Sequence, residues 1–231
     1  MKNILLIGGS YGIGLAIAKE MQYDNHVFIA SRTNDNIVDM NVTYIPFDVT
    51  TDTLDTTKLP DQIDGLVYCP GSINLRPFKG IKPDAFESDL QINFIGIVKV
   101  IQAILPNLTA SNQSSIVLFS SVAASMGMPF HTSVAAAKGA VEGFAKALAA
   151  EYAPKIRVNV IAPSLTDTPL ADKFLNNDVK REKSAERHPL KRFGTSEDMA
   201  QIAHFLLSEK SSWISGQIFH VDGGMSTLLV N

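Results

Sequence analysis

Seven short apolar runs alternate with helix-like stretches along the whole chain. The runs are Ile4–Ile7, Val27–Ala30, Tyr44–Phe47, Gly65–Cys69, Ile116–Phe119, Arg157–Ile161 and Gln217–Val221. Strands that are apolar on both faces belong to parallel sheets, because helices cover both sides of such a sheet. The 231 residues contain no evident linker or repeat. We therefore predict a single domain over 1–231, an α/β fold with a three-layer, doubly wound parallel sheet of the Rossmann type.

Helical patterns fill the stretches between these runs. Helices are predicted over Phe86–Leu105 and Val134–Ala150, and another should begin near Thr195, where Thr195-Ser-Glu-Asp198 has the form of a capping box. The segment Thr166–Leu190 is rich in Asn, Lys, Asp, Glu and Pro and has the least regular pattern. Because it follows a predicted strand, we expect it to form a mobile flap over a site.

Composition excludes several classes of protein. The formal net charge of -3 gives no reason to expect a nucleic acid or a membrane surface as partner. Cys69 is the only cysteine, so no intrachain disulfide can form, and with no signal peptide visible a cytoplasmic protein is expected. The five histidines lack the spacing of metal ligands, and no metal site is predicted.

A glycine-rich turn follows the first predicted strand. Its sequence is Gly8-Gly-Ser-Tyr-Gly12-Ile-Gly14, and a helical pattern begins directly after it. Glycines at a strand-to-helix turn let the backbone approach a pyrophosphate, and the helix N-terminus supplies N–H donors. The turn therefore indicates a dinucleotide site. A tight turn that only packs the helix closely on the sheet is the alternative.

The second predicted strand ends in Ser31-Arg32, with no acidic residue. Dinucleotide folds often place an acid here to bind the hydroxyls of the adenosine ribose. A guanidinium instead suits a 2′-phosphate, which favours NADP(H) over NAD(H). The alternative is that Arg32 is a solvated surface residue.

Motifs spread over nearly the whole chain resemble those of the short-chain dehydrogenase/reductase family. Gly8–Gly14 matches its glycine motif, and Pro189–Gly194 and Gly216–Gly224 match its C-terminal pattern. Ser121, followed thirteen positions later by Val134–Lys138, resembles its Ser and Tyr-x-x-x-Lys, except that valine stands at the tyrosine position. The resemblance implies an oxidoreductase that transfers hydride between a nicotinamide and a carbonyl or alcohol substrate.

The resemblance also implies roles for individual residues. Ser121 would orient the substrate, Lys138 would hold the nicotinamide ribose, and Asn93 would hold a water of a proton relay. Together, the glycine turn and the resemblance predict these cofactor-binding residues: Gly8, Ser10, Tyr11, Gly12, Ile13, Gly14, Ser31, Arg32, Asp48, Val49, Cys69, Pro70, Gly71, Lys138, Pro163, Ser164, Thr166 and Thr168.

The chain departs from the family pattern in three places. Tyr68–Gly71 retains only the glycine of Asn-Asn-Ala-Gly, Ser164 replaces the glycine of a Pro-Gly pair, and Val134 replaces the catalytic tyrosine. Valine has no ionisable group and cannot pass a proton to a carbonyl oxygen. The proton source is therefore open: water, His131 one turn earlier, or none. The rival interpretations are a silent cofactor-binding relative and an inactivated variant of a reductase.

A homo-oligomer, dimer or tetramer, is also expected. Val134, Val141 and Leu148 recur every seven residues on one predicted helix, with alanines between them. In the family this helix pairs across a two-fold axis. The alternative is that the stripe faces only the sheet of its own chain.

Overall fold

The sheet has seven parallel strands, and all seven predicted strands are confirmed. A computed structural model describes residues 1–230. The strands are β1 (Lys2–Ile7), β2 (Asn25–Ser31), β3 (Val42–Pro46), β4 (Gly65–Tyr68), β5 (Ser114–Phe119), β6 (Ile156–Pro163) and β7 (Ile218–Val221). Their order is β3-β2-β1-β4-β5-β6-β7, so successive strands are added on one side of β1 up to β3 and on its other side from β4 onward. The carboxyl ends of β1 and β4, in register at Ile7 and Tyr68, open the crevice where such folds bind ligands.

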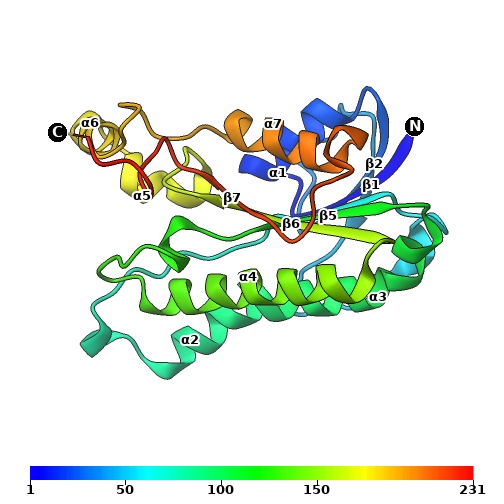
Figure 1. The fold of residues 1–231 in the computed structure, drawn as a ribbon, viewed down its shortest axis with the longest axis horizontal. Helices are drawn as coiled ribbons and strands as arrows, with labels where there is room; N and C mark the ends of the chain where they lie inside the picture. The colour runs from blue at the N-terminus through cyan, green and yellow to red at the C-terminus, as the bar shows by residue number, and fades with distance from the viewer. Residues whose placement is uncertain (231) are drawn as a thin grey trace.

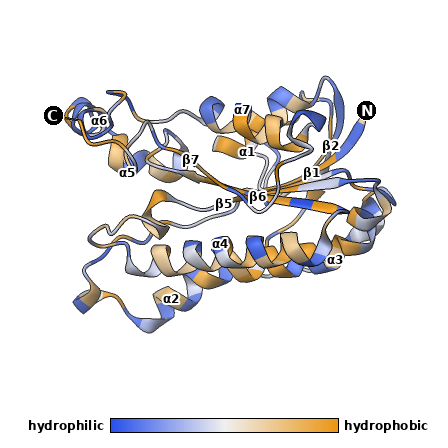
Figure 2. Ribbon diagram, viewed as in Figure 1, coloured by the Kyte–Doolittle hydropathy of each residue, from blue (hydrophilic) through white to orange (hydrophobic). Residues whose placement is uncertain are grey.

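Helices cover both faces of the sheet (Figure 1). They are α1 (Gly12–Met21), α2 (Pro83–Leu90), α3 (Gly96–Ala110), α4 (Thr132–Tyr152), α5 (Asp172–Leu175), α6 (Asp178–Glu186) and α7 (Ser196–Leu207). The helices α1 and α7 lie on one face, and α2, α3 and α4 lie on the other. The strands between them are mostly apolar (Figure 2), as a sheet buried on both faces requires. The capping box at Thr195 and Asp198 is confirmed.

The helix predicted over Phe86–Leu105 is longer and is interrupted by a π-turn. A π-helical turn, Gln91–Ile95, joins α2 to α3. The whole stretch Pro83–Ala110 has the length and hydropathy of a membrane span. One face of this stretch is nevertheless packed into the core, through apolar side chains that include Ile97, Val100, Ile101 and Ile104. Such packing is typical of a core helix in a globular domain.

The segment Thr166–Leu190 is more regular than its sequence pattern indicates. It contains α5 and α6, and the Asn177 side chain caps α6 by accepting from the N–H of Lys180. Residues of both helices line a cavity, which agrees with a segment that lies over a site, and its mobility stays a prediction. One sequence-based expectation is wrong. Val134, Val141 and Leu148 are buried within the chain, so this stripe does not form a subunit interface. Heptad spacing on a helix marks an apolar face but does not say what that face packs against.

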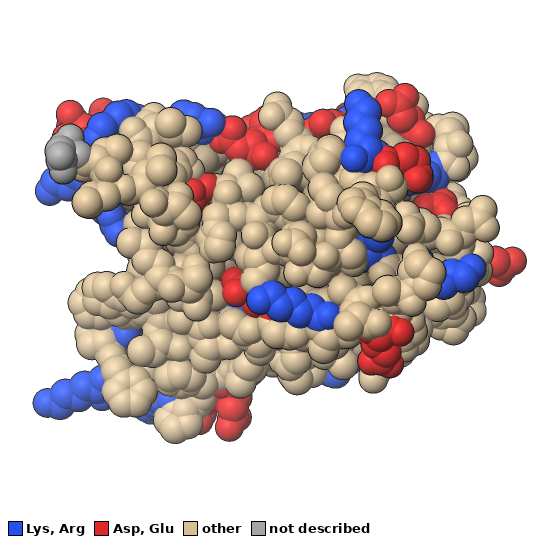
Figure 3. All heavy atoms as spheres, in the orientation of Figure 1, with Lys and Arg blue, Asp and Glu red and all other residues tan. Residues whose placement is uncertain are grey.

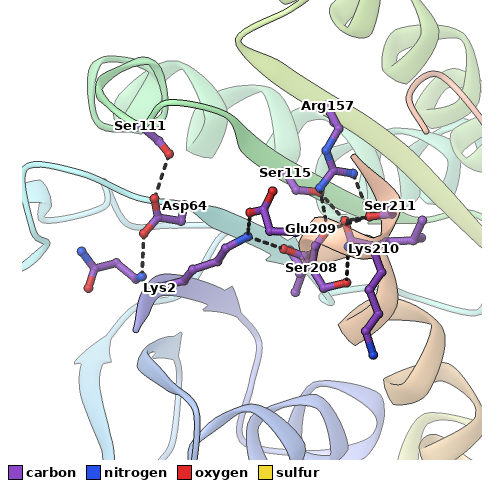
Figure 4. A network of polar contacts seen from close by, with 12 residues as sticks. Lys2, Asp64, Ser111, Ser115, Arg157, Ser208, Glu209, Lys210 and Ser211 are labelled. Atoms are coloured by element: carbon purple, nitrogen blue, oxygen red, sulfur yellow. Dashed lines mark hydrogen bonds and ion pairs between the residues drawn. The ribbon is translucent and has the colours of Figure 1, made fainter. Parts of the chain in front are cut away.

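A polar network ties the amino ends of the strands to the segment after α7 (Figure 4). Arg157, near the start of β6, donates to Ser211 Oγ at 3.0 Å. Lys2, at the start of β1, forms an ion pair with Glu209 at 2.5 Å. The network lies at the amino ends of the strands, opposite the crevice. Polar bonds therefore hold the amino end of the sheet together, whereas the carboxyl end is open.

Candidate active site

A cavity of about 690 Å³ opens along the carboxyl edge of the sheet, between the glycine turn and the ends of β2, β3 and β4. The structure brings most of the predicted cofactor residues together there. Those that line it are Gly8, Ser10, Tyr11, Gly12, Ile13, Gly14, Ser31, Arg32, Asp48, Val49, Cys69, Pro70, Gly71 and Thr168. Residues from five separate segments thus meet in one cleft.

The glycine turn has the geometry that a pyrophosphate needs. Gly8 and Gly12 have φ of 76° and 51°, in the left-handed region that favours glycine. A Cβ on Gly14 would lie 2.3 Å from the carbonyl oxygen of Gly8. Tyr11, the N-cap of α1, makes no side-chain capping bond, and the first turn of α1 holds no acidic residue. The first N–H groups of α1 are therefore free to bind an anion.

Two charged side chains, Arg32 and Asp48, line this cavity near the ends of β2 and β3. Arg32 is exposed and lines the cavity, and it forms no ion pair within residues 1–230. The carboxylate of Asp48 accepts from the hydroxyl of Thr50 at 2.6 Å and from its N–H at 2.8 Å. These two bonds, helped by the charge of Arg32, lower the pKa of Asp48. Both ionised groups remain available to a polar ligand.

Tyr68 explains one departure from the family pattern. Its hydroxyl donates to the carbonyl oxygen of Ile92 at 2.7 Å, inside the π-turn. A π-turn displaces backbone carbonyls from the regular α-helical ladder, so a side chain can satisfy one of them. Gly96 lets the helix pass this ring closely, since a Cβ there would lie 2.2 Å from the tyrosine oxygen. Tyr68 therefore anchors the helix that carries Asn93.

Asn93 lies in the π-turn and is fully buried. Its Nδ2 donates to Ser72 Oγ at 2.8 Å and to the carbonyl oxygen of Asp89 at 2.9 Å. Its Oδ1 accepts from the N–H of Ser72 at 3.3 Å. The bond to Asp89 is one that a helix side chain can make within its own helix, and the two bonds with Ser72 reach a separate segment. Asn93 is therefore held rigidly beside Gly71.

Lys138 approaches the same glycine from α4. Its Nζ donates to the carbonyl oxygen of Phe119 at 2.9 Å. A Cβ on Gly71 would lie 3.8 Å from that Nζ and 3.3 Å from Asn93 Oδ1. Burial lowers the pKa of Lys138 to about 8, and the nearby Cys69 and Asp89 oppose that shift. The fold thus places a buried ammonium and an amide together at the end of β4.

A second cavity, of about 470 Å³, lies under α5 and α6. Ser121, His131 and Val134 line it. The hydroxyl of Ser121 accepts from the N–H of Ala123 at 3.2 Å, which leaves its own proton for another acceptor. His131 is the N-cap residue of α4, and its Nδ1 donates to the carbonyl oxygen of Pro129 at 2.7 Å. Val134 is 5% exposed, so the cavity wall here is apolar.

Four predicted cofactor residues do not line the first cavity. Ser164 lines the second cavity, and Lys138, Pro163 and Thr166 line neither. His188, which sequence reasoning missed, also lines the second cavity, where it bonds to Ser164. Only folding brings these two residues together, since 24 positions separate them in the chain.

We expect Cys69 to be an unreactive thiol. Burial raises its pKa to about 12, which Lys138 only partly offsets. Alkylation by iodoacetamide at pH 8 should be roughly a thousandfold slower than for a thiol with a pKa near 8.5, because the thiolate is the nucleophile. Labelling followed by mass spectrometry measures this, with urea-unfolded protein as the fast control. Equal rates in the folded and unfolded states would contradict it.

Comparison with known proteins agrees with this architecture. Residues 8–226 match the family described as enoyl-(acyl carrier protein) reductase. The chain is 30% identical over 239 residues to 3-oxoacyl-[acyl-carrier-protein] reductase of Buchnera aphidicola subsp. Baizongia pistaciae, with 97% of each chain covered. It is also similar to the ligand-free aldohexose dehydrogenase of Thermoplasma acidophilum, with a TM-score of 0.90 and 27% identity over 100% of this chain and 96% of that one.

A third similar protein carries a bound cofactor. It is a gluconate 5-dehydrogenase from Burkholderia cenocepacia J2315 in complex with NADP and tartrate, with a TM-score of 0.89 and 25% identity over 99% of this chain and 96% of that one. The two solved structures share the fold of this chain, and all three relatives are oxidoreductases by name. The family match spans most of the chain, and the relatives are matched over nearly their full length. The chain therefore belongs to the short-chain dehydrogenase/reductase family.

Proposed function

We propose that the protein is an NADP(H)-dependent oxidoreductase that transfers hydride between the nicotinamide and a carbonyl or alcohol substrate. The observation that carries this is the pair of cavities: one is lined by the glycine turn and Arg32, the other by Ser121. Lys138 and Asn93 meet at Gly71, which lines the first of them. The residues present therefore fit a dinucleotide whose nicotinamide end reaches a substrate chamber.

Each retained residue has a task in this proposal. When bound, the cofactor supplies or accepts the hydride at the substrate carbon. The hydroxyl of Ser121 donates to the substrate oxygen and orients it. The ammonium of Lys138 donates to the ribose hydroxyls, and the rigid amide of Asn93 keeps a relay water in place.

The cofactor preference rests on Arg32. It is an unpaired guanidinium at the adenosine end, and no acidic residue ends β2. Asp35, the nearest acid in sequence after the strand, accepts from the hydroxyl of Tyr11 at 3.2 Å and does not line the cavity. The NADP held by the related gluconate 5-dehydrogenase supports the same preference.

We further propose that the reaction is slow because Val134 stands at the tyrosine position. Val134 lines the substrate cavity one helical turn before Lys138, where a phenol would reach both the substrate and the ammonium. A missing general acid typically lowers a rate by about 10²–10⁴. Positioning and hydride transfer do not depend on that group, so weak turnover is expected to remain.

The substrate chamber has a cationic wall. Lys180 and Lys183 of α6 and its C-cap residue Arg187 line it, at spacings that share one face of the helix. The acidic residues of that helix do not line the cavity: Asp178, Glu182 and Glu186. Figure 3 shows Lys and Arg side chains bordering the α5–α6 end of the molecule. This charge favours carbonyl substrates that carry a carboxylate or another anionic group.

Cofactor oxidation over a panel of carbonyl compounds tests the function. Keto acids and their methyl esters should be compared as pairs, with NADPH consumption followed by absorbance. We expect slow consumption with several carbonyls and a higher kcat/KM for the acid of each pair. No consumption with any carbonyl, by native protein and Val134→Tyr variant that both bind NADPH, would contradict the proposal. Equal rates for acids and esters would contradict only the charge preference.

We predict that the protein is a homo-oligomer, most simply a tetramer. The buried stripe of α4 cannot form the interface, but its opposite face carries small, accessible residues: Ala136, Gly139, Ala140, Gly143 and Ala147. Small residues let two helices approach closely. Light scattering at micromolar concentration should give a multiple of 25.0 kDa, and Gly143→Trp should reduce it. A monomer at that concentration would overturn the prediction.

We also propose a cytoplasmic location, which is inferred from the single cysteine.

A further inference from the structure

We propose that Ser164 and His188, here called the Ser164–His188 pair, deliver the proton to the substrate oxygen in the slow turnover that remains without the tyrosine. This inference rests on the proposed function, because it concerns the same reduction in the same chamber. The proton source proposed here is distinct from both His131 and Ser121. It also gives a reason why the chain keeps the rest of the site intact around Val134.

The pair forms a short hydrogen-bonded chain. His188 Nε2 lies 2.7 Å from Ser164 Oγ, and His188 Nδ1 lies 2.7 Å from the carbonyl oxygen of Ser184. A carbonyl can only accept, so Nδ1 carries a hydrogen and the ring orientation is fixed. His188 is 3% exposed. A buried imidazole with both nitrogens engaged is oriented for proton transfer and not merely solvated.

The pair lines the cavity that the missing acid would also line. Ser164, directly after β6, and His188, just after α6, line the same cavity as Ser121 and Val134. By the family resemblance, serine at 164 replaces a glycine and valine at 134 replaces the tyrosine. The two departures therefore meet in one chamber. Valine at 134 removes a hydroxyl from the chamber wall, and serine at 164 adds one. That coincidence is what a relocated proton donor would produce.

The step balances with the imidazolium form of His188. As hydride reaches the carbonyl carbon, the electrons of the C=O π bond move onto oxygen. The O–H bond of Ser164 breaks, and its proton bonds to that oxygen. The Nε2–H bond of His188 breaks, and its proton restores the serine hydroxyl. The nicotinamide is oxidised, the carbonyl becomes an alcohol, and the neutral imidazole keeps Nδ1–H on Ser184 until water reprotonates it.

His131 is the less favourable donor. It belongs to the loop that ends at the N-cap of α4, and its Nδ1 is held by Pro129. No serine or threonine hydroxyl extends its reach into the chamber within residues 1–230, since its only recorded hydrogen bond is that one. The Ser164–His188 pair instead ends in the hydroxyl of Ser164, which lines the chamber.

The test uses the full chain in two backgrounds, native and Val134→Tyr. Ser164→Ala and His188→Gln should each lower kcat for NADPH-dependent carbonyl reduction by about tenfold or more in the native chain. In the Val134→Tyr background, where the phenol donates, the same changes should cost less than about threefold. Ser164→Thr keeps the hydroxyl and should restore most of the native rate. NADPH affinity, measured by fluorescence, should remain within about twofold throughout.

The controls separate a catalytic role from a structural one. His26→Gln alters an exposed histidine near the amino end of β2 and should leave the rate unchanged. Equal losses in both backgrounds would mean that the pair only supports the chamber wall, and would overturn the inference. Full native activity in Ser164→Ala would overturn it as well, as would a loss seen only in His131→Gln. Native protein with no turnover, beside an active Val134→Tyr, would defeat this inference alone. Inactivity of both would defeat the proposed function with it.

Discussion

Replacing Val134 with tyrosine is expected to raise the rate of NADPH-dependent carbonyl reduction by about 10²–10⁴-fold. The side chain at 134 lines the substrate chamber and lies one turn before Lys138 on α4. The buried ammonium of Lys138 favours the ionised phenol, and so lowers the pKa of a tyrosine placed there toward the working pH. Ser121 remains available to hold the substrate oxygen. Steady-state kinetics of both proteins on the same carbonyl panel measures the effect.

The new side chain has space to enter. Val134 borders a cavity of about 470 Å³, so a phenol can extend into the chamber with local repacking that costs about 1–3 kcal/mol. Val134→Phe is the matched control, since it fills the same space without a hydroxyl and should not accelerate the reaction. A phenylalanine variant as fast as the tyrosine variant would sink the account. So would a native protein that already turns over at about 10 per second, an ordinary enzyme rate.

NADPH is expected to bind roughly ten- to a hundredfold more tightly than NADH, and Arg32→Gln to abolish that difference. A charged hydrogen bond from Arg32 to the 2′-phosphate contributes about 1.5–3 kcal/mol, which sets the size of the preference. The lowered pKa of Asp48 keeps its carboxylate ionised near Arg32 in both titrations. Calorimetric titration of each protein with both cofactors gives the two ratios.

Lys19→Gln supplies the control for that titration. It removes one positive charge from the exposed face of α1, the helix that begins in the glycine turn, but Lys19 does not line the cavity. Its preference for NADPH should match that of the native chain. Equal affinity of the native protein for both cofactors, or tighter NADH, would show that Arg32 does not contact the ligand.

Sequence patterns predicted the sheet because its strands are short, apolar on both faces and punctuated by glycine and polar residues. The glycine turn and the cavity it lines were predictable for the same reason: the carboxyl ends of neighbouring parallel strands meet at one edge. The stripe through Val141 was assigned to a subunit interface, although it packs on the sheet, because periodicity does not identify the partner of a face. The regularity of Thr166–Leu190 was missed because α5 and α6 are short and strongly polar.

The contacts that matter most for chemistry were the least predictable. His188 has no motif of its own, and its partner Ser164 was expected to face the cofactor. Tyr68 was seen as a departure from a pattern, and its bond to Ile92 depends on a π-turn that local propensity does not reveal. The Ser164–His188 and Tyr68–Ile92 bonds both depend on packing between segments distant in the chain. Residue types and their spacing do not reveal such packing.

The π-turn Gln91–Ile95 acts as a phase shift between two helices. In a regular α-helix each residue advances the direction of its side chain by about 100°. One extra residue in this turn lets Asp89 and Asn93 face Ser72 while Ile97 and Ile101 still face the sheet. Deleting a single residue there would rotate all of α3 by about that angle relative to α2, and one of the two faces would lose its partner. Exposed Ile95 can vary in kind at little cost, but the length of this turn cannot vary.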